Sequence, residues 1–457
     1  MTGMDGKKIG AWALFAVVFC GVSYLALYQA SLKRLGAAGW SDWSGAVTYA
    51  GLGISVLMVL YLLFQAVLVC FYKPVDDPSG ELPGCTVVVP AYNEGSAVAE
   101  TLRSLLRSDY PKDRLEIIAV NDGSADDTWN WIKLVSGESD GIVRAVNFER
   151  NQGKKAALYH GFTTAKHDIV VTIDSDSLVE PGTLAELVRP FVRRDVGGVA
   201  GTVRVGNLRD GFVPRMLDIF FVFSCDFLRC AQSAIGAVLC SPGAISAYRK
   251  AALLPHLDGW LNQTFMGRPS HIGEDRALTS ILLRHDYRVV LQHGARVTTR
   301  VPADYPQLCR TLIRWTRGDV REGLLMIGHF FRRWPRSWRI LGLQVILVFQ
   351  LLGLMLPVLA LPMLLTVLSA GAHDAEVMFH YLIAVGWGWA TIPAILYAER
   401  ESPIRALYAF AVGIFNMFAL SWICVYSWIT VRNSKWMTRE IRAAKTETVY
   451  STPRRIS

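Results

Sequence analysis

Two aspartates, Asp174 and Asp176, stand directly after a short β-branched run from Ile169 to Ile173. The run has the composition of a buried strand, so the chain delivers both carboxylates to the point where that strand ends. Two hard oxygen donors close together suit Mg²⁺ or Mn²⁺ and, through the metal, a diphosphate. The alternative is ordinary loop chemistry, because Asp and Ser hydrogen-bond their own backbone in turns.

Other candidate residues lie in short polar motifs spread along the chain. Each motif alone has a structural interpretation: Asn121 to Ser124 is a turn sequence, Lys154 and Lys155 are a solvated basic pair, and Asp275 caps a helix that starts near Arg276. In chain order the motifs are Val-Val-Pro-Ala-Tyr-Asn-Glu (88–94), Asn-Asp-Gly-Ser (121–124), Gly-Lys-Lys (153–155), Asp-Ser-Asp (174–176), Gly-Glu-Asp-Arg (273–276) and Arg-Trp (314–315).

The elements that must position these motifs alternate between strands and helices. Apolar runs predict strands over residues 85–90, 115–120, 142–147 and 169–173, and helical spacing predicts helices over residues 94–107 and 154–165. Strand and helix in alternation imply parallel strands joined by crossover helices. The sequence has neither a Gly-x-Gly-x-x-Gly motif nor a phosphate loop, which counts against dinucleotide enzymes and ATPases.

The composition predicts a membrane protein. Hydrophobic residues make up 52% of the 457 residues, and the mean hydropathy is +0.29. Long apolar segments occupy residues 9–30, 46–72, 340–370, 377–398 and 406–431. The first could also be a signal peptide, but it is long and a second segment follows closely. The eight cysteines lack the short paired spacings of zinc sites or disulfide frameworks, which favours a reducing, cytosolic setting for the polar part.

The net charge of +9 comes largely from basic residues beside the hydrophobic segments. This placement favours anionic lipids and a phosphate-bearing substrate as partners and argues against nucleic acid. The arginines between 332 and 339 predict that segment 340–370 starts on the cytosolic side. Three crossings would then put the tail outside, yet the tail is basic, which predicts inside. One segment is therefore re-entrant, or Pro357 and Pro362 break segment 340–370 into two crossings.

Residues 310–334 mix apolar side chains with arginines at helical spacing. This composition fits a helix lying flat in the membrane interface. It fits a surface helix of the polar domain equally well.

The six motifs in this order resemble the signature of the family 2 inverting glycosyltransferases. The flanking hydrophobic segments and the Gly-Glu-Asp-Arg-Ala-Leu-Thr form at 273–279 resemble, within that family, the nodulation chitin-oligosaccharide synthases and the hyaluronan synthases. The resemblance covers roughly residues 85–322 and the membrane layout. It implies a GT-A-like α/β nucleotide-sugar-binding domain on the cytosolic side of the plasma (inner) membrane, inserted between transmembrane α-helices.

The domain organisation expected from this resemblance has six parts. They are two transmembrane helices (1–72), a linker (73–84), the glycosyltransferase domain (85–305), amphipathic interface helices (306–339), transmembrane helices in three hydrophobic segments (340–431) and a basic cytosolic tail (432–457). The segment Lys435 to Arg439 resembles one that follows the last span of these synthases on the cytosolic face, which supports a tail on the inside.

The resemblance also implies roles for individual residues. The catalytic group comprises Glu274, Asp275 and Arg276, with Asp275 as the base that deprotonates the acceptor hydroxyl. A divalent cation, Mn²⁺ or Mg²⁺, binds at Asp176, and positive charge for the leaving nucleoside diphosphate comes from Lys154 and Arg314, with Arg276 as a further candidate. The remaining substrate-binding residues are Tyr92, Glu94 and Asp122 at the nucleotide, Asp174, Ser241 in the loop beneath the acceptor, and Trp315 stacked on the acceptor sugar.

The match to the acceptor loop continues to Tyr248. Two residues have structural alternatives, and one position departs from the family pattern. Tyr248, near the acceptor loop, could be a core residue, and Trp315 could belong to a membrane aromatic belt. The family has Gln-x-x-Arg-Trp where this chain has Thr311, which keeps a hydroxyl but lacks the reach of the Gln side chain.

The function expected from the resemblance is processive β-glycosyl transfer from a UDP-sugar to a growing polysaccharide that leaves the cell through the protein's own helices. The expected donor is UDP-N-acetylglucosamine, with or without UDP-glucuronate. Transfer of one sugar to a lipid acceptor is the first alternative, and a transporter with an inactive domain is the second. The expected partners are the UDP-sugar, the polysaccharide and membrane lipids. The sequence identifies no partner for secretion.

Overall fold

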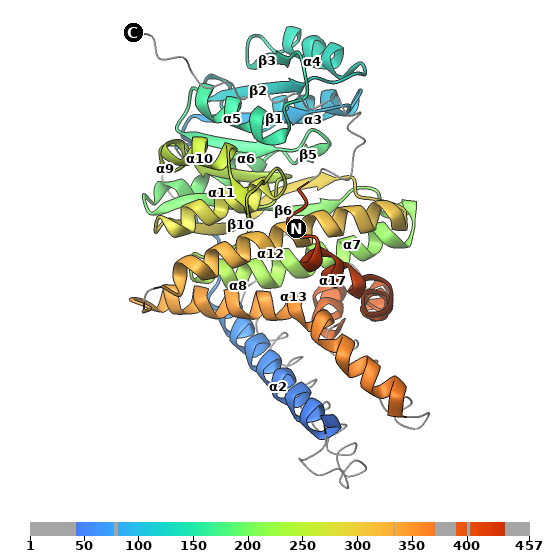
Figure 1. Cartoon of the computed structure of the whole chain (residues 1–457). Coiled ribbons are helices and arrows are strands. Elements are labelled where there is room, and N and C mark those ends of the chain that lie inside the picture. The colour runs from blue at the N-terminus through green and yellow to red at the C-terminus, as the bar shows by residue number, and fades with distance from the viewer. Residues whose placement is uncertain (1–42, 77–80, 333, 371–389, 400–402, 435–457) are drawn as a thin grey trace.

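The computed structural model describes residues 43–76, 81–332, 334–370, 390–399 and 403–434 (Figure 1). Three features expected from the sequence lie outside these residues. They are the hydrophobic segment 9–30, most of segment 377–398, and the tail from Lys435 onward.

An eight-stranded sheet forms the centre of the polar region, in the order β3-β2-β1-β4-β7-β6-β10-β5. The strands are β1 (Cys85–Ala91), β2 (Leu115–Asp122), β3 (Val143–Phe148), β4 (Ile169–Ile173), β5 (Ser177–Val179), β6 (Val196–Val205), β7 (Ile245–Arg249) and β10 (Arg288–Thr299). β1 to β4 run parallel, whereas β7 is antiparallel to both of its neighbours. The four strands predicted from apolar runs are confirmed to within two residues.

Helices cover both faces of the sheet, as the predicted crossover connections require. They are α3 (Ala97–Leu106), α4 (Thr128–Gly137), α5 (Lys154–Thr164), α6 (Thr183–Val188), α7 (Phe212–Phe223), α8 (Arg229–Ala234), α9 (Lys250–Leu253), α10 (Leu257–Leu261) and α11 (Glu274–Arg284). A π-helical turn, Ser224–Leu228, joins α7 to α8, and a small hairpin of β8 (Thr264–Phe265) and β9 (Arg268–Pro269) precedes α11. The helices predicted over 94–107 and 154–165 correspond to α3 and α5.

Two hydrophobic cores lie on opposite faces of the sheet because side chains alternate along each strand. Along β1, Val87 and Val89 enter one core with α3, α4 and α6, while Val88 enters the other with α5, α7, α8 and α11. The second core continues into the helices below the sheet. The sheet and these helices therefore pack as one body.

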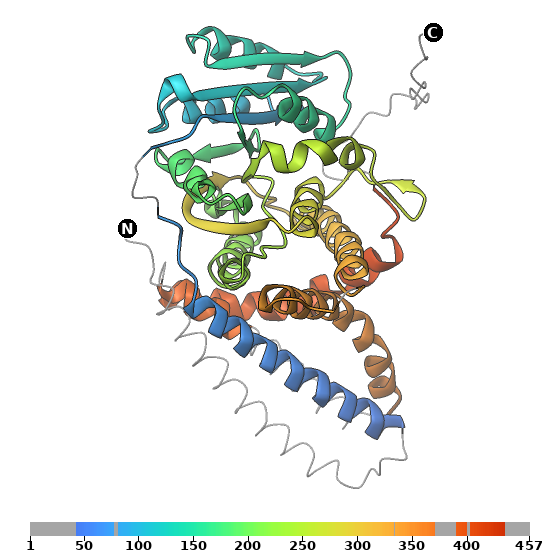
Figure 2. The same ribbon diagram turned by 90° about the vertical axis from the view of Figure 1, so that its left-hand side faces the viewer.

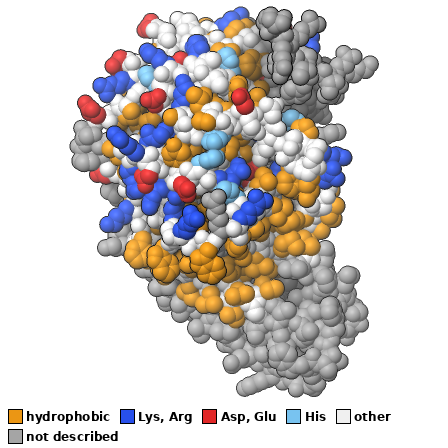
Figure 3. Space-filling model, turned by 60° about the vertical axis from the view of Figure 1, so that its left-hand side comes forward, with side chains coloured by type: hydrophobic (Ala, Val, Ile, Leu, Met, Phe, Trp, Pro, Cys, Tyr) orange, Lys and Arg blue, Asp and Glu red, His pale blue; other side chains and the backbone are white. Residues whose placement is uncertain are grey.

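The helices on the far side of this second core form the membrane-side part of the chain. They are α2 (Trp43–Cys70), α12 (Tyr305–Phe330), α13 (Trp338–Ala370), α15 (Pro403–Ala406), α16 (Tyr408–Phe415) and α17 (Ser421–Ile429), with a π-helical turn at Asn416–Leu420. α2 and α13 extend away from the sheet on the same side (Figure 2). On the face drawn in Figure 3, charged side chains cover the sheet region, and hydrophobic ones gather toward the membrane-side helices.

Two helical stretches of the described residues, Trp338–Val358 and Ile404–Ile429, are long and apolar enough to cross a membrane. A shorter apolar stretch, Val56–Cys70, lies in α2, ahead of the sheet. The sheet region is therefore flanked by apolar helices on both sides in the sequence, which fits association with a membrane.

Two expectations from the sequence need correction. The prolines at 357 and 362 do not break segment 340–370, since α13 is helical from Trp338 to Ala370 and only changes direction along its length (Figure 1). α12 is not a surface helix of the polar domain. It packs between α11, α13 and α17 and buries Arg317 and Arg321 completely or nearly so.

Candidate active site

The carboxyl ends of β1, β2 and β4 meet at one edge of the sheet, because these strands run parallel. Tyr92 follows β1, Asp122 ends β2 and Asp174 follows β4. Ligands of open parallel α/β sheets bind at this edge. The topology therefore brings residues from three of the sequence motifs to the place where a ligand is expected.

Lys154 begins α5 and reaches carboxylates from two other elements. Its Nζ lies 2.6 Å from Oδ1 of Asp174 and 3.0 Å from Oε1 of Glu274. Burial opposes the charged ammonium, but these two carboxylates outweigh burial and raise the pKa of Lys154 above its ordinary value. The solvated basic pair considered from the sequence is wrong for Lys154, whose side chain is 19% exposed.

Glu274 and Asp275 form the first turn of α11. Gly273 is the N-cap residue, with φ of +78°, and a Cβ at Gly273 would lie 3.3 Å from the Cα of Gly318 on α12. Only glycine combines that backbone conformation with so close an approach. Because Gly273 occupies the N-cap position, Asp275 is not the cap that the structural interpretation of this motif required.

Asp275 is held by backbone amides on both of its oxygens. The amide of Gly243 donates to Oδ2 at 3.0 Å, and the amide of Arg276 donates to Oδ1 at 2.8 Å. Burial, together with the charge of Glu274, raises the pKa of Asp275 to about 6 despite these bonds and the nearby Lys154. A fixed carboxylate with a pKa near neutrality is suited to accept a proton from a hydroxyl.

Glu274 behaves oppositely although it is the neighbouring residue. Burial would raise the pKa of Glu274, but the charges of Lys154 and Arg314 outweigh burial and lower it. The site thus holds one ionised carboxylate next to one poised to exchange a proton, a separation typical of acid–base sites.

A small cavity opens beside these charges, lined among others by Pro90, Asp174, Gly243, Tyr248 and Asp275. A Cβ on Gly243 would lie 3.0 Å from Nζ of Lys154 and 3.6 Å from Oδ2 of Asp275, so the loop closes on the site through bare backbone. Ser241, in the same loop, is fully buried, and its amide donates to Oγ1 of Thr279 on α11. Tyr248 is 1% exposed in β7, as its core interpretation predicts.

α12 carries the predicted Arg-Trp motif along the membrane side of the site. Arg314 is close enough to Glu274 to lower its pKa, and half-buried Trp315 packs against Phe221 of α7, with ring centroids 6.1 Å apart. Arg276 pairs with Asp319 of α12 at 2.7 Å. Arg276 therefore clamps α11 to α12 in this structure.

Comparison with known proteins decides the family. The family described as Glycosyl transferase family 2 matches residues 86–254. An N-acetylglucosaminyltransferase from Sinorhizobium fredii (strain NBRC 101917 / NGR234) is 31% identical over 82% of this chain and 88% of the relative, and a hyaluronan synthase from Streptococcus pyogenes is 30% identical over 84% and 90%. The chain belongs to glycosyltransferase family 2.

The fold agrees with this family. A solved mannosyltransferase from Pyrobaculum calidifontis, in complex with GDP-Man and Mn²⁺, superposes with a TM-score of 0.56 at 24% identity, over 82% of this chain and 98% of its own. The GT-A-like fold expected from the sequence is thereby confirmed. The family match ends at residue 254, so the Glu274–Asp275 pair lies beyond it.

Three residues predicted to bind the nucleotide in this glycosyltransferase lie at or just after the ends of the neighbouring strands β1 and β2. Glu94 accepts a hydrogen bond from Oγ of Ser175 at 2.8 Å, and Tyr92 is half-buried. The carboxylate of Asp122 accepts bonds from Asn151 and from the amides of Gln152 and Gly153, at 2.7 to 3.1 Å. Asp122 thus holds the loop that leads into Lys154, and its predicted contact with uracil stays a prediction.

The metal predicted at Asp176 can be tested against the donor set. Among the described residues, no cluster of three or more His, Cys, Asp or Glu side chains could hold a metal ion. Asp176 accepts a long hydrogen bond, 3.4 Å, from Oγ1 of Thr299, while Oδ1 of Asp174 binds Lys154. Mg²⁺ bound with nucleotide phosphates takes only one or two protein carboxylates, so Asp176 fits a metal that is held mainly by the substrate's diphosphate.

Several charged side chains around the site are buried although their local sequence does not predict it. Lys155 is 5% exposed, and its Nζ donates to the carbonyls of Trp260 and Ser270. Arg317 and Arg321 are buried in α12. The available signal was the pattern of α12, where these two arginines lie four residues apart on the same helix face as apolar residues.

Proposed function

We propose that this glycosyltransferase is a membrane-embedded, inverting and processive enzyme that polymerises sugar from a UDP-sugar into an extracellular polysaccharide and translocates the product. The proposed donor is UDP-N-acetylglucosamine, alone or alternating with UDP-glucuronate. The catalytic domain faces the cytosol of the plasma (inner) membrane, within the six-part organisation expected from the sequence. The supporting relatives are named as an N-acetylglucosaminyltransferase and a hyaluronan synthase.

The observation that carries this proposal is the buried Asp275, fixed by two amides, with a pKa of about 6. Asp275 accepts the proton of the acceptor hydroxyl as that oxygen attacks the anomeric carbon of the donor from the face opposite the leaving UDP. Lys154 and Arg314 place fixed positive charge beside the reacting groups, where departing diphosphate oxygens gain negative charge. Asp176 would hold a divalent ion, Mn²⁺ or Mg²⁺, which would supply positive charge at the leaving group.

The acceptor side of the proposal rests on α12. Trp315 lies where the sheet domain meets the membrane-side helices, packed beside α7. An aromatic ring at that junction can stack on a sugar at the start of a path through the helices. The two apolar stretches in α13 and α15–α17 supply helices long enough to line such a path.

The test is UDP release by the purified full chain in detergent, with Mn²⁺ or Mg²⁺, across a panel of UDP-sugars and with product sizing. We expect one N-acetylhexosamine donor to give a ladder or a long polymer, or two donors to be required together for a copolymer. A product that remains a single sugar on lipid would replace the proposal with lipid glycosylation. Absence of UDP release with every donor would refute a UDP-sugar substrate.

A further inference from the structure

One buried arginine connects the catalytic turn with the end of the last apolar helix. Arg321, 1% exposed, lies on α12, two turns after Trp315. Its Nη1 donates to Oγ of Ser270 and to the carbonyl of Ile272 at 3.2 Å, and its Nη2 donates to the carbonyl of Val431 at 3.0 Å. The guanidinium also lies 5.7 Å from the ring centroid of Phe265.

The turn bound by Arg321 leads directly into the catalytic pair. Ile272 is followed by Gly273, Glu274 and Asp275, so the carbonyl that Arg321 holds is three residues from the proposed base. The same turn is bound by a second buried cation, because Nζ of Lys155 donates to the carbonyl of Ser270 at 2.8 Å. Two buried cations therefore fix this backbone.

The other partner of Arg321 belongs to the chain that leaves α17. One helical turn earlier on α12, Arg317 donates to Oγ1 of Thr430 at 3.1 and 2.8 Å and lies over the ring of Tyr426. These bonds hold the end of α17 against α12, next to the point where Arg321 binds the carbonyl of Val431. The docked end lies on the membrane side of the site.

Two further bonds tie the residues after Val431 to the β8–β9 hairpin. Arg432 donates to the carbonyl of Met266 at 3.2 Å, and Oγ of Ser434 donates to the carbonyl of Pro269 at 2.6 Å. The hairpin, the catalytic turn and the end of α17 therefore meet around one guanidinium. Arginine suits this task because its planar fork can bind several carbonyls at once, whereas a lysine ammonium presents only a point charge.

We propose that Arg321 is a positioning residue for sugar transfer, which holds the turn before Asp275 against the end of α17. Asp275 is then correctly positioned only while the end of α17 is bound to α12. A displacement of the last apolar helix would therefore change the position of the catalytic carboxylate. This inference rests on the glycosyltransferase activity of the family and on Asp275 as its base. It does not depend on whether the product is a polymer.

The experiment compares Arg321→Gln and Arg321→Lys with a matched control, Arg249→Gln. Arg249 also donates to backbone carbonyls, those of Val196, Phe191 and Arg193, and lies 5.4 Å from a phenylalanine ring, but at the opposite edge of the sheet. For each full-length variant in detergent, UDP binding counts the folded sites. Donor hydrolysis and sugar transfer are then measured per site, using the donor that the wild type accepts.

We expect Arg321→Gln to lower the transfer kcat per UDP-binding site roughly 10- to 100-fold, because small misplacements of a catalytic group cost that much. The KM for the donor should stay near the wild-type value, and the ratio of hydrolysis to transfer should rise. Arg321→Lys should recover only part of the loss. Arg249→Gln should lower thermal stability and leave the ratio and the per-site kcat unchanged.

A second variant keeps the test decisive if Arg321→Gln fails to fold. Ser270→Ala removes one acceptor with little change in volume, and we expect a loss of transfer of about 3- to 10-fold. In the double variant with Arg321→Gln, the fold-loss of transfer should be smaller than the product of the two single losses, since both substitutions remove the same contact. Three results would each overturn the proposal. The first is a wild-type kcat per site in both Arg321→Gln and Ser270→Ala, and the second is an equal loss of kcat in Arg249→Gln. The third is a loss in the double variant that equals the product of the two single losses. If the wild type transfers no sugar at all, the proposed function fails instead.

Discussion

Charged side chains have different partners at the two edges of the central sheet, the edge at the carboxyl ends of the parallel strands and the edge at their amino ends. At the carboxyl edge, Lys154, Asp174, Glu274 and Asp275 converge from three elements onto one small cavity. Their charges act on one another strongly enough to move the pKa values of Lys154, Glu274 and Asp275. These groups line a small cavity at the carboxyl ends of the strands.

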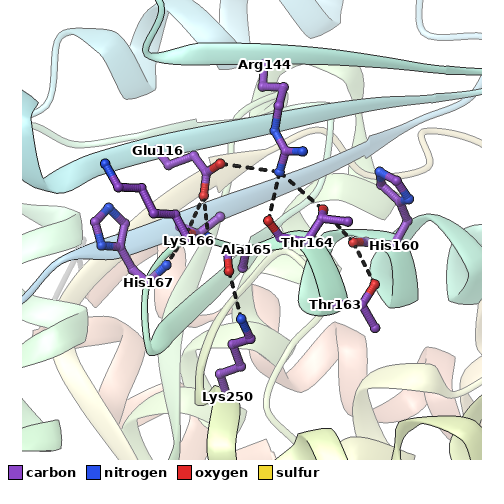
Figure 4. Close-up of polar contacts among 10 residues, drawn as sticks. Glu116, Arg144, His160, Thr163, Thr164, Ala165, Lys166, His167 and Lys250 are labelled. Carbon is purple, nitrogen blue, oxygen red and sulfur yellow. Dashed lines mark hydrogen bonds and ion pairs between the residues drawn. The ribbon is translucent and has the colours of Figure 1, made fainter.

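At the amino edge, the charges bind the protein's own backbone (Figure 4). Arg144 pairs with Glu116 at 3.3 Å and donates to the carbonyl of Thr164 at the end of α5. Glu116 also accepts the amide of Lys166 at 2.8 Å, and Lys250 donates to the carbonyl of Ala165 at 2.7 Å. Helix ends and strand starts are thereby satisfied locally.

The charged side chains at the amino edge stabilise the fold, whereas those at the carboxyl edge are placed where a reaction can take place. The side-chain charges of Arg144, Glu116 and Lys250 all have partners in the folded chain itself. At the carboxyl edge Glu274 and Asp275 are adjacent, and both are buried. Burial and the charge of Glu274 raise the pKa of Asp275, which lowers the stability of the fold near neutral pH. Such a cost is typical of sites where the charge serves a reaction.

The largest expected effect is on Asp275. Asp275→Asn keeps the shape but removes the group that accepts the proton, so we expect transfer to fall by about 10²- to 10⁴-fold with UDP affinity nearly intact. The measurement is transfer rate alongside UDP titration. Glu116→Gln, the same change at the amino edge, should retain transfer. Loss of UDP affinity in Asp275→Asn would refute its assignment as the base.

Lys154→Met should have the next largest effect. It removes the cation between Asp174 and Glu274 and leaves two carboxylates without their partner, so we expect kcat/KM to fall by roughly 10²- to 10³-fold. UDP affinity should fall as well, because fixed positive charge near the diphosphate is lost. Steady-state kinetics and UDP titration check both. Unchanged UDP affinity would place Lys154 outside the nucleotide site.

The pH dependence follows from the raised pKa of Asp275, about 6. A base works only when deprotonated, so kcat/KM should fall about tenfold per pH unit below about pH 6 and level off above it. Glu274→Gln removes a negative charge that raises the pKa of Asp275, so the acidic limb should move to lower pH. A profile that stays flat down to pH 4.5 would contradict Asp275 as the titrating group.

The sequence predicts the parallel strands at the active edge well because β1, β2 and β4 are buried on both faces and are largely apolar. It predicts no strand over 196–205, where β6 contains three glycines and is held by pairing with distant β7 and β10. Local pattern carries no information on such long-range pairing.

The candidate site, like the sheet, is only partly predictable from the sequence. Motif order places Lys154 and Asp275 together, since both belong to an ordered family signature. It does not reveal that Lys155, one residue along α5, turns to the 260–270 loop, or that Arg276 finds Asp319. Both contacts join residues far apart in the sequence, and the local pattern around Lys155 and Arg276 does not separate a buried cation from a solvated one.

The smallest expected effect is at the amino edge, with Arg144→Ala. Its side chain is 42% exposed and pairs with Glu116, which is 18% exposed, so water already screens part of the interaction. We expect the free energy of unfolding to fall by about 0.5 to 1 kcal/mol, because an ion pair and a bond to the last carbonyl of α5 are lost together. Thermal unfolding in detergent measures this loss, and the transfer rate per UDP-binding site should equal that of the wild type. Arg144→Lys keeps the charge beside the helix end and should recover part of the stability. If Arg144→Ala instead lowered transfer without lowering stability, the amino edge would have a role in the reaction, and the distinction between structural and chemical charge would fail where it is easiest to test.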